Sequence, residues 1–387
     1  MNQDPRAPRA EIAKAPDSAS VKEPVSAAIK KWRMSPFASA YPSGYKLPLC
    51  AIALLLAVML VMMTMLTASV CVLEGDFHFP TFQKPSQNSS LGGVAGQDGD
   101  RPFADGQSGN VQLPTAENIQ IIPANKLYSS HAALASLSTG EVIASRKMDE
   151  SIYPASMTKV MTLIVIAENL PREDCLRDTI KVSQAAYDAM TAAGASGVGM
   201  KTGDQYSVEA MLYALMLQSD GIAATELAKY VAGSEEDFVE LMNLKAERMG
   251  LKNTHFTNPT GLYHKDHVSS CRDIASIMAY AMNMELCRKI LKTEAYSTYC
   301  TTAAGEKIAH TFYHKLTVTQ FDSVSPHQPN GVTVVAGKTG FTDESRFCLV
   351  TYAESKDGRG YVCVTASSGS YKECIADYLT VYNNYIK

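Results

Sequence analysis

Residues 153–160, YPASMTKV, place a serine and a lysine three positions apart, at Ser156 and Lys159. If Ser156 opens a helix, Lys159 lies one turn later on the same face, so the hydroxyl and the amine can meet. A serine hydroxyl needs a base to take its proton. A lysine serves as that base only where desolvation or a second cation lowers its usual pKa of about 10.4. The structural alternative is a helix capped by Ser156, with Lys159 in solvent.

Two later stretches supply the groups that such a catalyst needs. LQSDGIAA places Ser219 in a turn between two apolar helical segments, where its hydroxyl can enter a cleft. AGKTGFTDES places Lys338, Thr339 and Gly340 at the end of a β-rich run, where glycine lets a substrate backbone approach the strand edge. Lys338 is the second cation and can hold an anionic group. The structural alternatives are a helix cap for Ser219 and a hairpin lysine for Lys338.

Taken in this order, the three stretches resemble the motifs of the serine penicillin-binding family, which comprises D-alanyl-D-alanine peptidases and β-lactamases. The family pattern of S-x-x-K, S-x-N and K-T-G falls at 156–159, 219–221 and 338–340, with intervals that suit the low-molecular-weight carboxypeptidases. The stretch MGLKNTHFTNPTGL, at 249–262, is also similar to that subgroup. The resemblance covers about residues 126–387 and implies a serine-type D-Ala-D-Ala carboxypeptidase.

The resemblance implies a reaction that needs neither a cofactor nor a metal ion. Ser156 would attack the carbonyl of the penultimate D-alanine in a peptidoglycan stem peptide, with Lys159 as general base. Ser219 would relay the proton to the leaving amine of the terminal D-alanine. Water would then cleave the acyl-enzyme, as a step of cell-wall maturation. A β-lactam antibiotic would acylate Ser156 in the same way and act as a covalent inhibitor.

The resemblance implies that the third motif binds the substrate. Lys338 and Thr339 would hold the terminal carboxylate, and Gly340 would leave room for the substrate backbone. The backbone N–H groups of Ser156 and Phe341 would form the oxyanion hole, where each donor contributes a few kcal/mol to catalysis.

The second motif departs from the family at Gly221, a substrate-binding position where the family has asparagine. The asparagine amide hydrogen-bonds the substrate peptide and helps to position the base lysine, so glycine removes both contacts. Asp220 is a candidate substitute. Two alternatives to the carboxypeptidase therefore stay open. One is a β-lactamase of the same fold, which needs a deacylating acid between the first two motifs. The other is a catalytically weakened homologue that binds or regulates the wall.

Other copies of the motifs stand in the wrong order or the wrong setting. A second K-T-G, at Lys201–Gly203, precedes the second motif. The S-x-N triplets at Ser86–Asn88 and Ser108–Asn110 precede the first motif, in a stretch of linker composition. A further S-x-x-K, at Ser43–Lys46, lies before a long apolar run. None of these copies can complete the site.

Hydrophobic periodicity predicts a mixed fold for residues 126–387. The stretch 131–147 alternates as a β-hairpin around Ser-Thr-Gly, and three more β-rich runs lie between 331 and 368. Helical patterns fill the region between them, and an amphipathic helix closes the chain. One sheet forms only if the N-terminal hairpin pairs with the late strands. The expected fold class is α/β (α+β), β-lactamase/transpeptidase-like, with a five-stranded antiparallel sheet flanked by helices and a largely helical subdomain.

The run from Leu47 to Leu73 carries no charge and exceeds the about 20 apolar residues that cross a bilayer. Both the run and its leader are too long for a secretory signal peptide, and the polar tail before it argues against a buried core helix. The run therefore predicts an uncleaved membrane anchor. Residues 1–46 carry the basic side chains next to it, so the positive-inside rule places them in the cytoplasm.

The residues after the anchor are therefore expected outside the cell, attached to its membrane by the N-terminal helix. Residues 74–125 are rich in Gly, Ser, Gln, Asp and Pro and poor in aliphatic side chains, which predicts a flexible spacer. The catalytic domain would then occupy residues 126–387.

Charge and cysteine content exclude some other classes. The net charge of −4 and the lack of a basic stripe with interleaved aromatics give no support for a nucleic-acid partner. Of nine cysteines, only Cys50 and Cys71 fall in the predicted anchor, and no C-x-x-C spacing indicates zinc. The odd number outside cannot all pair within one chain. We expect most of these cysteines to be buried apolar side chains, and the sequence does not decide whether two of them form a disulfide.

Two histidine clusters do not indicate a site. His310 and His314 are four residues apart, but AHTFYHKLTV favours a strand, and no third ligand stands at a spacing typical of a metal site. His264, Asp266 and His267 follow NPTGLY in a polar turn, which predicts a surface location.

Overall fold

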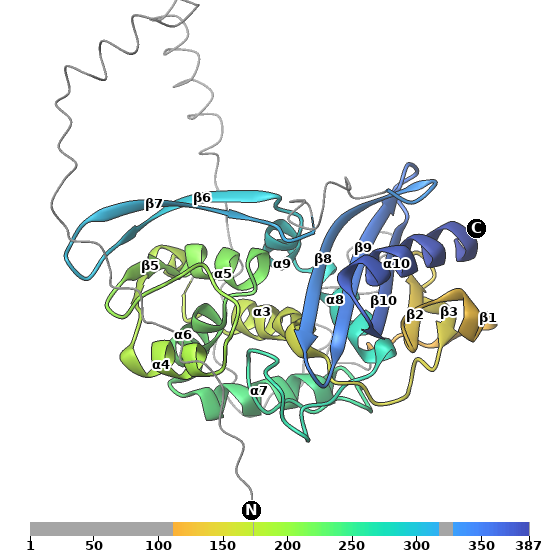
Figure 1. Cartoon of the computed structure of the whole chain (residues 1–387), viewed down its shortest axis with the longest axis horizontal. Helices are drawn as coiled ribbons and strands as arrows, with labels where there is room; N and C mark the ends of the chain where they lie inside the picture. Colours follow the sequence, from red (N-terminus) through yellow and green to blue (C-terminus); the bar gives the residue numbers. More distant parts are fainter. Residues whose placement is uncertain (1–110, 173, 317–327, 387) are drawn as a thin grey trace, which may run out of the picture. The chain divides into compact units, whose positions relative to one another are not determined.

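The computed structural model describes residues 111–172, 174–316 and 328–386 (Figure 1). The predicted cytoplasmic tail, the anchor at 47–73 and most of the predicted spacer lie outside the described residues and stay predictions. Within the described part of the chain, no helix has both the length and the apolar character that a membrane crossing requires.

Six strands form the main sheet, in the order β1-β3-β2-β10-β9-β8. The N-terminal hairpin pairs with the late strands as predicted, because β2 and β10 are antiparallel neighbours with Leu134 opposite Cys363. Strands β8, β9 and β10 continue the sheet as an antiparallel meander. The strands are β1 (Thr115–Ile121), β2 (His131–Ser136), β3 (Glu141–Arg146), β8 (Val332–Thr342), β9 (Arg346–Ser355) and β10 (Gly360–Ser368).

The main sheet has one strand more than the five predicted, because β1 comes from the segment that we assigned to the spacer. Strand β1 runs parallel to β3 at the edge of the sheet. Its sequence, TAENIQI, is mostly polar, since an edge strand is held by backbone hydrogen bonds and exposes most of its side chains. Leu113 and Ile122, on either side of it, are buried. The predicted domain boundary at residue 126 is therefore too late.

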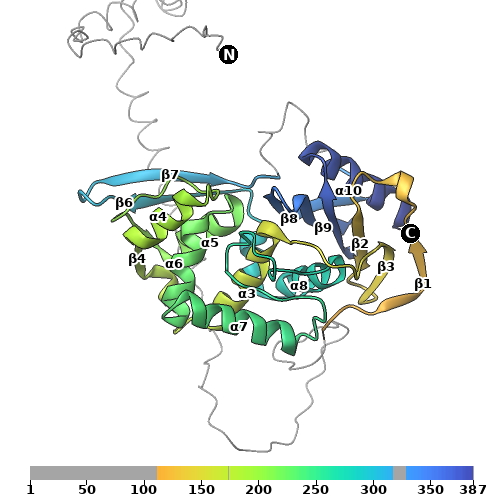
Figure 2. The same ribbon diagram turned by 60° about the horizontal axis from the view of Figure 1, so that its bottom comes forward.

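Helices pack against the sheet from both sides (Figures 1 and 2). The predicted closing helix, α10 (Tyr371–Tyr385), contacts β9 and β10, and α8 (Cys271–Asn283) contacts β2 and β10. Two separate apolar clusters result. The smaller one includes Tyr378 and Tyr382 of α10, and the larger one joins α8 to the remaining helices.

Helix α3 (Lys159–Glu168) is the central helix of the helical subdomain. Its sequence, KVMTLIVIAE, is apolar on all sides, and every residue from 159 to 166 is buried. A helix of that kind packs inside a core, and α3 contacts α5, α6, α7, α8 and α9. The remaining helices are α4 (Gln184–Ala192), α5 (Val208–Leu217), α6 (Gly221–Ala232), α7 (Glu235–Arg248) and α9 (Glu285–Leu291).

A second sheet has the strand order β4-β5-β6-β7. Its strands are β4 (Thr179–Lys181), β5 (Gln205–Ser207), β6 (Ala295–Thr301) and β7 (Lys307–Tyr313). The β6–β7 hairpin packs on α5 (Figure 1). The predicted strand at 309–318 is confirmed for His310, which lies on β7.

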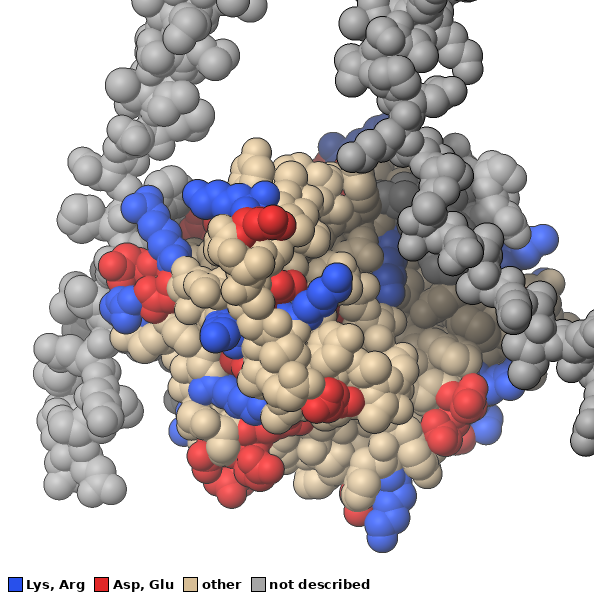
Figure 3. Space-filling model, turned by 60° about the vertical axis from the view of Figure 1, so that its left-hand side comes forward, with Lys and Arg blue, Asp and Glu red and all other residues tan. Residues whose placement is uncertain are grey.

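The seven cysteines of the described residues are all buried and free. They are the small apolar side chains that the sequence indicated, and no disulfide joins any two of them. The surface, in contrast, mixes acidic and basic side chains, as one face shows in Figure 3. Such mixed surface charge is ordinary for a solvated protein and contributes little to stability.

Candidate active site

Ser156 lies on a short, strained turn that leads into the central helix. The 3-10 turn η3 (Ala155–Thr158) precedes α3, and Ala155 has a left-handed φ of 46°. This conformation is costly for residues other than glycine and is typical of functional sites. Pro154 and Thr158, the residues that cap η3 and α3, make no side-chain cap hydrogen bond. Ser156 itself is not a helix cap, so the structural alternative for it is wrong.

Lys159 points into the protein rather than into solvent, with 3% of its surface exposed. Its Nζ lies 3.2 Å from Oγ of Ser156 and donates a hydrogen bond of 2.6 Å to the carbonyl of Thr260. Burial lowers the pKa of Lys159 to about 7, an effect that the Asp220 carboxylate opposes and the Lys315 ammonium reinforces. A lysine with that pKa is unprotonated in a large fraction of molecules at neutral pH and can act as a base.

Ser219 occupies the turn between α5 and α6, where it adopts a left-handed φ of 61°. The N-cap of α6 is Asp220, so the structural alternative for Ser219 is wrong as well. Ser219 is 3% exposed, and its buried hydroxyl has no hydrogen-bond partner among the described residues. A buried hydroxyl without a partner is costly. A hydroxyl of this kind in a strained turn is therefore typical of a group that hydrogen-bonds a substrate.

Asp220 does not stand in for the missing asparagine, because its carboxylate is already used. Oδ1 accepts a hydrogen bond of 2.8 Å from the backbone of Ala223, and Oδ2 accepts one of 2.7 Å from the backbone of Val198. The side chain thus caps α6 and holds the glycine-rich loop 194–199 against the start of this helix.

Gly221 permits the same contact between loop and helix. Its N–H donates to the carbonyl of Ser196. A Cβ at position 221 would lie 2.8 Å from Sδ of Met190 and 3.0 Å from Cβ of Ala195. A side chain at 221 would therefore be directed at Met190 and the loop, and glycine is explained by this close packing.

We predict that Gly221→Asn will not restore a family-like second motif. The new side chain must displace Met190, so we expect a loss of about 1–3 kcal/mol in the free energy of unfolding from overpacking and no gain in the activity of the site. Steady-state kinetics and urea unfolding of the variant check both. Gly233→Asn, at the C-terminal end of the same helix, is the control for activity, because a Cβ there meets no atom within 4 Å, although its φ of +88° adds a conformational cost to stability. A tenfold gain in kcat/KM would contradict the prediction.

The third motif lies on β8 beside the nucleophile turn. Lys338 is 2% exposed, and its Nζ donates to the carbonyl of Thr339 at 2.9 Å. Burial, with the neighbouring charges of Lys159 and Lys315, lowers the pKa of Lys338 well below its ordinary value. Lys338 is therefore not the solvent-facing hairpin lysine of the structural alternative.

Gly340 brings this strand against the serine. A Cβ at position 340 would lie 3.0 Å from the carbonyl oxygen of Pro154 and 3.1 Å from the backbone nitrogen of Ser156. The next residue, Phe341, is 44% exposed, and the centre of its ring lies 4.5 Å from the centre of the Phe347 ring on β9. The structure thus brings the first and third motifs together, although Ser156 and Lys338 are 182 residues apart in the chain.

The segment 258–261, NPTG, is part of the site although no residue of it was predicted. The Thr260 carbonyl holds Lys159, and Asn258 Oδ1 accepts hydrogen bonds from the backbone of Thr260 and Gly261. Gly261 has a φ of +79°, and a Cβ there would lie 1.9 Å from the carbonyl oxygen of Ala155. The only sequence signal was the similarity of 249–262 to the carboxypeptidases, which indicates no role for single residues.

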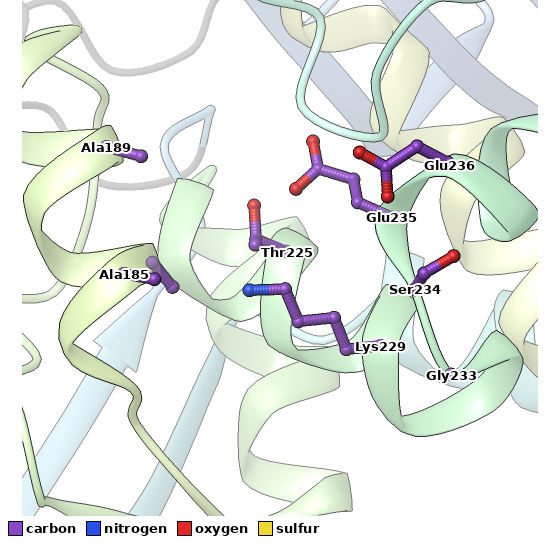
Figure 4. Close-up of a pocket in the computed structure, with 9 residues that line it drawn as sticks. Ala185, Ala189, Thr225, Lys229, Gly233, Ser234, Glu235 and Glu236 are labelled. Atoms are coloured by element: carbon purple, nitrogen blue, oxygen red, sulfur yellow. The ribbon is translucent and has the colours of Figure 1, made fainter.

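A separate cavity of about 350 Å³ lies between α4, α6 and the start of α7 (Figure 4). Thr225, Lys229 and Glu235 are among its lining residues, together with small side chains of α4 such as Ala185 and Ala189. No motif residue lines this cavity, so it is distinct from the candidate active site.

Comparison with known proteins identifies the family. Residues 118–367 match the family described as D-alanyl-D-alanine carboxypeptidase. The match spans more than half of the chain and includes all three motifs. The chain belongs to the D-alanyl-D-alanine carboxypeptidase family. The family predicted from the motifs is confirmed.

Relatives of this carboxypeptidase family member are known in several bacteria. D-alanyl-D-alanine carboxypeptidase DacF of Bacillus subtilis is 33% identical over 238 residues, which are 61% of this chain and 57% of the relative. DacC of Escherichia coli is 39% identical over 140 residues, 35% of each chain. The chain therefore spans less than two thirds of the length of these two relatives.

The fold comparison points to the same family. The crystal structure of the Streptomyces K15 DD-transpeptidase has a TM-score of 0.59 at 26% identity, covering 66% of this chain and 96% of that one. The predicted α/β transpeptidase-like fold class is confirmed, with the sixth strand β1 as the difference in detail.

His267 supports the nucleophile turn of this carboxypeptidase family member, and its predicted surface location is wrong. His267 is 2% exposed and lies against η3, where it contacts Thr158. Nδ1 accepts a hydrogen bond from the backbone of Thr257 at 3.1 Å, so the proton resides on Nε2, which lies 2.8 Å from Oγ1 of Thr158 and donates to it. Burial, with further help from nearby cationic groups, lowers the pKa of His267 to about 3.

We predict that His267 makes stability depend on pH. Below its ordinary pKa of about 6.5, the histidine takes up a proton in the unfolded chain but not in the folded one. Its stabilising contribution is complete above pH 6.5 and is lost progressively toward pH 3. Urea unfolding should show a loss of about 2 kcal/mol from this group between pH 7.5 and 5. His267→Gln should remove that part of the slope, and an unchanged slope would contradict the assignment.

Proposed function

We propose that this chain releases the terminal D-alanine from D-Ala-D-Ala stem peptides of peptidoglycan through an acyl intermediate on Ser156. The observation that carries the proposal is the buried Lys159, whose Nζ lies 3.2 Å from Oγ of Ser156 and whose pKa burial lowers to about 7. Membership of the D-alanyl-D-alanine carboxypeptidase family supports the substrate class.

Acylation begins when neutral Lys159 takes the proton of Ser156. The carbonyl of Thr260 holds Nζ in place for this transfer. The serine oxygen then attacks the carbonyl carbon of the penultimate D-alanine. The backbone N–H groups of Ser156 and Phe341 receive the negative charge that develops on the carbonyl oxygen. The packing of Gly340 on the serine turn supports this pairing of donors.

Breakdown of the tetrahedral intermediate needs a proton for the departing amine. Lys159 returns the proton by way of Ser219, whose buried hydroxyl has no partner among the described residues. A water molecule then attacks the acyl-serine, with Lys159 again as base. Lys338 and Thr339 border the leaving D-alanine, and Gly221 leaves the substrate peptide without a side-chain partner from the second motif. β-Lactams follow the acylation route and block the serine.

The location of this chemistry follows from the N-terminal region. We propose that residues 47–73 anchor the protein in the cell membrane as a single span, with residues 1–46 in the cytoplasm. Residues 74–110 would then connect the span to an extracytoplasmic catalytic domain. Protease added to intact spheroplasts should digest the catalytic domain and leave the N-terminal tail protected. Protection of both would contradict this topology.

The test of the function uses the purified full chain. We expect a penicillin adduct on Ser156 by mass spectrometry and release of D-alanine from an N-acylated D-Ala-D-Ala peptide. Both should disappear in Ser156→Ala and persist in Ser297→Ala, a serine on strand β6. Rapid hydrolysis of penicillin would favour the β-lactamase, and the absence of both adduct and release would favour the weakened homologue.

A further inference from the structure

A buried hydroxyl lines the cavity between α4, α6 and the start of α7. Thr225 of α6 is 2% exposed, and its Oγ1 has no hydrogen-bond partner in the described part of the chain. Buried hydroxyls are normally paired, because an unpaired one has lost its contacts with water and gained nothing in return. In Figure 4 this hydroxyl points to the same space as the side chain of Glu235. A partner for Thr225 therefore has to come from a molecule in the cavity.

Two opposite charges face the same cavity. Lys229 lies one turn after Thr225 on α6, and Glu235 is the first residue of α7. Both side chains line the cavity and are half-buried, but neither forms an ion pair with another described residue. Burial raises the pKa of Glu235, an effect that the nearby Thr225 hydroxyl and Lys229 ammonium oppose. The two charges are thus near each other without touching, and the space between them can hold ligand atoms.

The wall that α4 contributes is small and apolar. It consists of Ala185, Ala186 and Ala189, and Figure 4 shows two of these methyl groups across the cavity from Lys229. The volume of about 350 Å³ is at the low end of the range for small-molecule sites, about 300–1,000 Å³. A ligand that fits this cavity is therefore small, with a short apolar part toward α4 and polar atoms toward the two charges.

We infer that this cavity binds a small α-amino acid in its zwitterionic form. The ligand carboxylate accepts hydrogen bonds from Lys229 and from the hydroxyl of Thr225, and the ligand ammonium donates to Glu235. The short side chain of the ligand lies against the alanines of α4. A ligand with a single charge would leave one half-buried charge of the cavity unpaired, so a zwitterion is the better fit. D-Alanine, the product of the proposed reaction, has this chemistry, but the inference does not depend on that reaction.

The experiment measures binding of four small molecules to the full chain by saturation-transfer NMR. D-Alanine and L-alanine carry both charges, D-lactate lacks the ammonium, and isopropylamine lacks the carboxylate. We expect dissociation constants of about 1 mM for alanine, and binding at least tenfold weaker for the two molecules with a single charge, as for the loss of one charge-assisted contact. Binding of either enantiomer supports the inference, and the tighter of the two identifies the source of the ligand.

Variants of the cavity locate the bound alanine. Lys229→Met and Glu235→Gln should each weaken binding about tenfold. Thr225→Val, which keeps the shape of the side chain, should weaken it about fivefold without lowering the stability of the free protein, since the hydroxyl has no partner to lose.

Glu240→Gln, at an exposed position of α7 outside the lining, is the matched control and should leave the affinity unchanged. Equal binding of all four molecules, or no binding of alanine up to about 10 mM, would overturn the inference. Alanine binding that survives in both Lys229→Met and Glu235→Gln would place the ligand elsewhere and overturn it as well. Release of D-alanine from a peptide is measured separately, so failure of the proposed function leaves these outcomes unaffected.

Discussion

Replacement of Lys159 by methionine should slow the acylation of Ser156 by about 10²–10⁴-fold, the usual contribution of a general base. Methionine has a similar length and no charge, so it fills the same buried position without a desolvation cost. The hydrogen bond to the Thr260 carbonyl and the base 3.2 Å from the serine oxygen are lost together. Stopped-flow acylation by a chromogenic β-lactam, with thermal unfolding as a check of the fold, measures the effect.

The pH profile separates a base from a merely structural lysine. Since burial lowers the pKa of Lys159 to about 7, the neutral fraction grows as pH rises. The acylation rate of the unsubstituted chain should therefore rise through about pH 7 and level off above it. Lys159→Arg keeps a cation that cannot deprotonate and should be as slow as Lys159→Met. Lys181→Met, at an exposed position on β4, is the control. A loss below tenfold would contradict the role of Lys159.

Replacement of Gly261 by alanine should disrupt the nucleophile turn. A Cβ at this position would lie 1.9 Å from the carbonyl oxygen of Ala155 and 2.9 Å from the nitrogen of Ser156, and neither backbone atom can rotate away. The φ of +79° adds a conformational cost of about 1–2 kcal/mol. With overpacking, we expect a loss of about 2–5 kcal/mol in the free energy of unfolding, and penicillin acylation should fall with it.

A second glycine separates the two costs of Gly261→Ala. Gly358 has a φ of +84°, but a Cβ added there would have no atom within 4 Å, so Gly358→Ala carries only the conformational cost. Urea unfolding should show Gly261→Ala to be the less stable of the two. Acylation of Ser156 should be normal in Gly358→Ala. Equal stability of the two variants would mean that the backbone of Ala155 moves aside at no cost.

Local pattern was sufficient for most of the fold. Periodicity placed the N-terminal hairpin, the central helix and the last three strands, because the pattern of apolar residues in each of these elements shows within a few residues which side is buried. It failed for β1, whose polar sequence TAENIQI forms a strand through backbone bonding to β3. An edge strand needs no apolar face, so composition alone assigned it to the spacer.

The order of the three motifs and the one-turn spacing of Ser156 and Lys159 are local patterns, so a reaction class could be predicted from the residues alone. The contacts that support the predicted site could not be predicted in this way. The tertiary structure buries Lys159 against the carbonyl of Thr260, 101 residues away, and places His267 behind the serine turn. It also directs position 221 toward Met190 and brings the backbone of Lys315 to the end of α5, where its N–H donates to the carbonyl of Leu217. These relations depend on packing between distant segments, and neither burial nor direction of a side chain is encoded in the residues next to it.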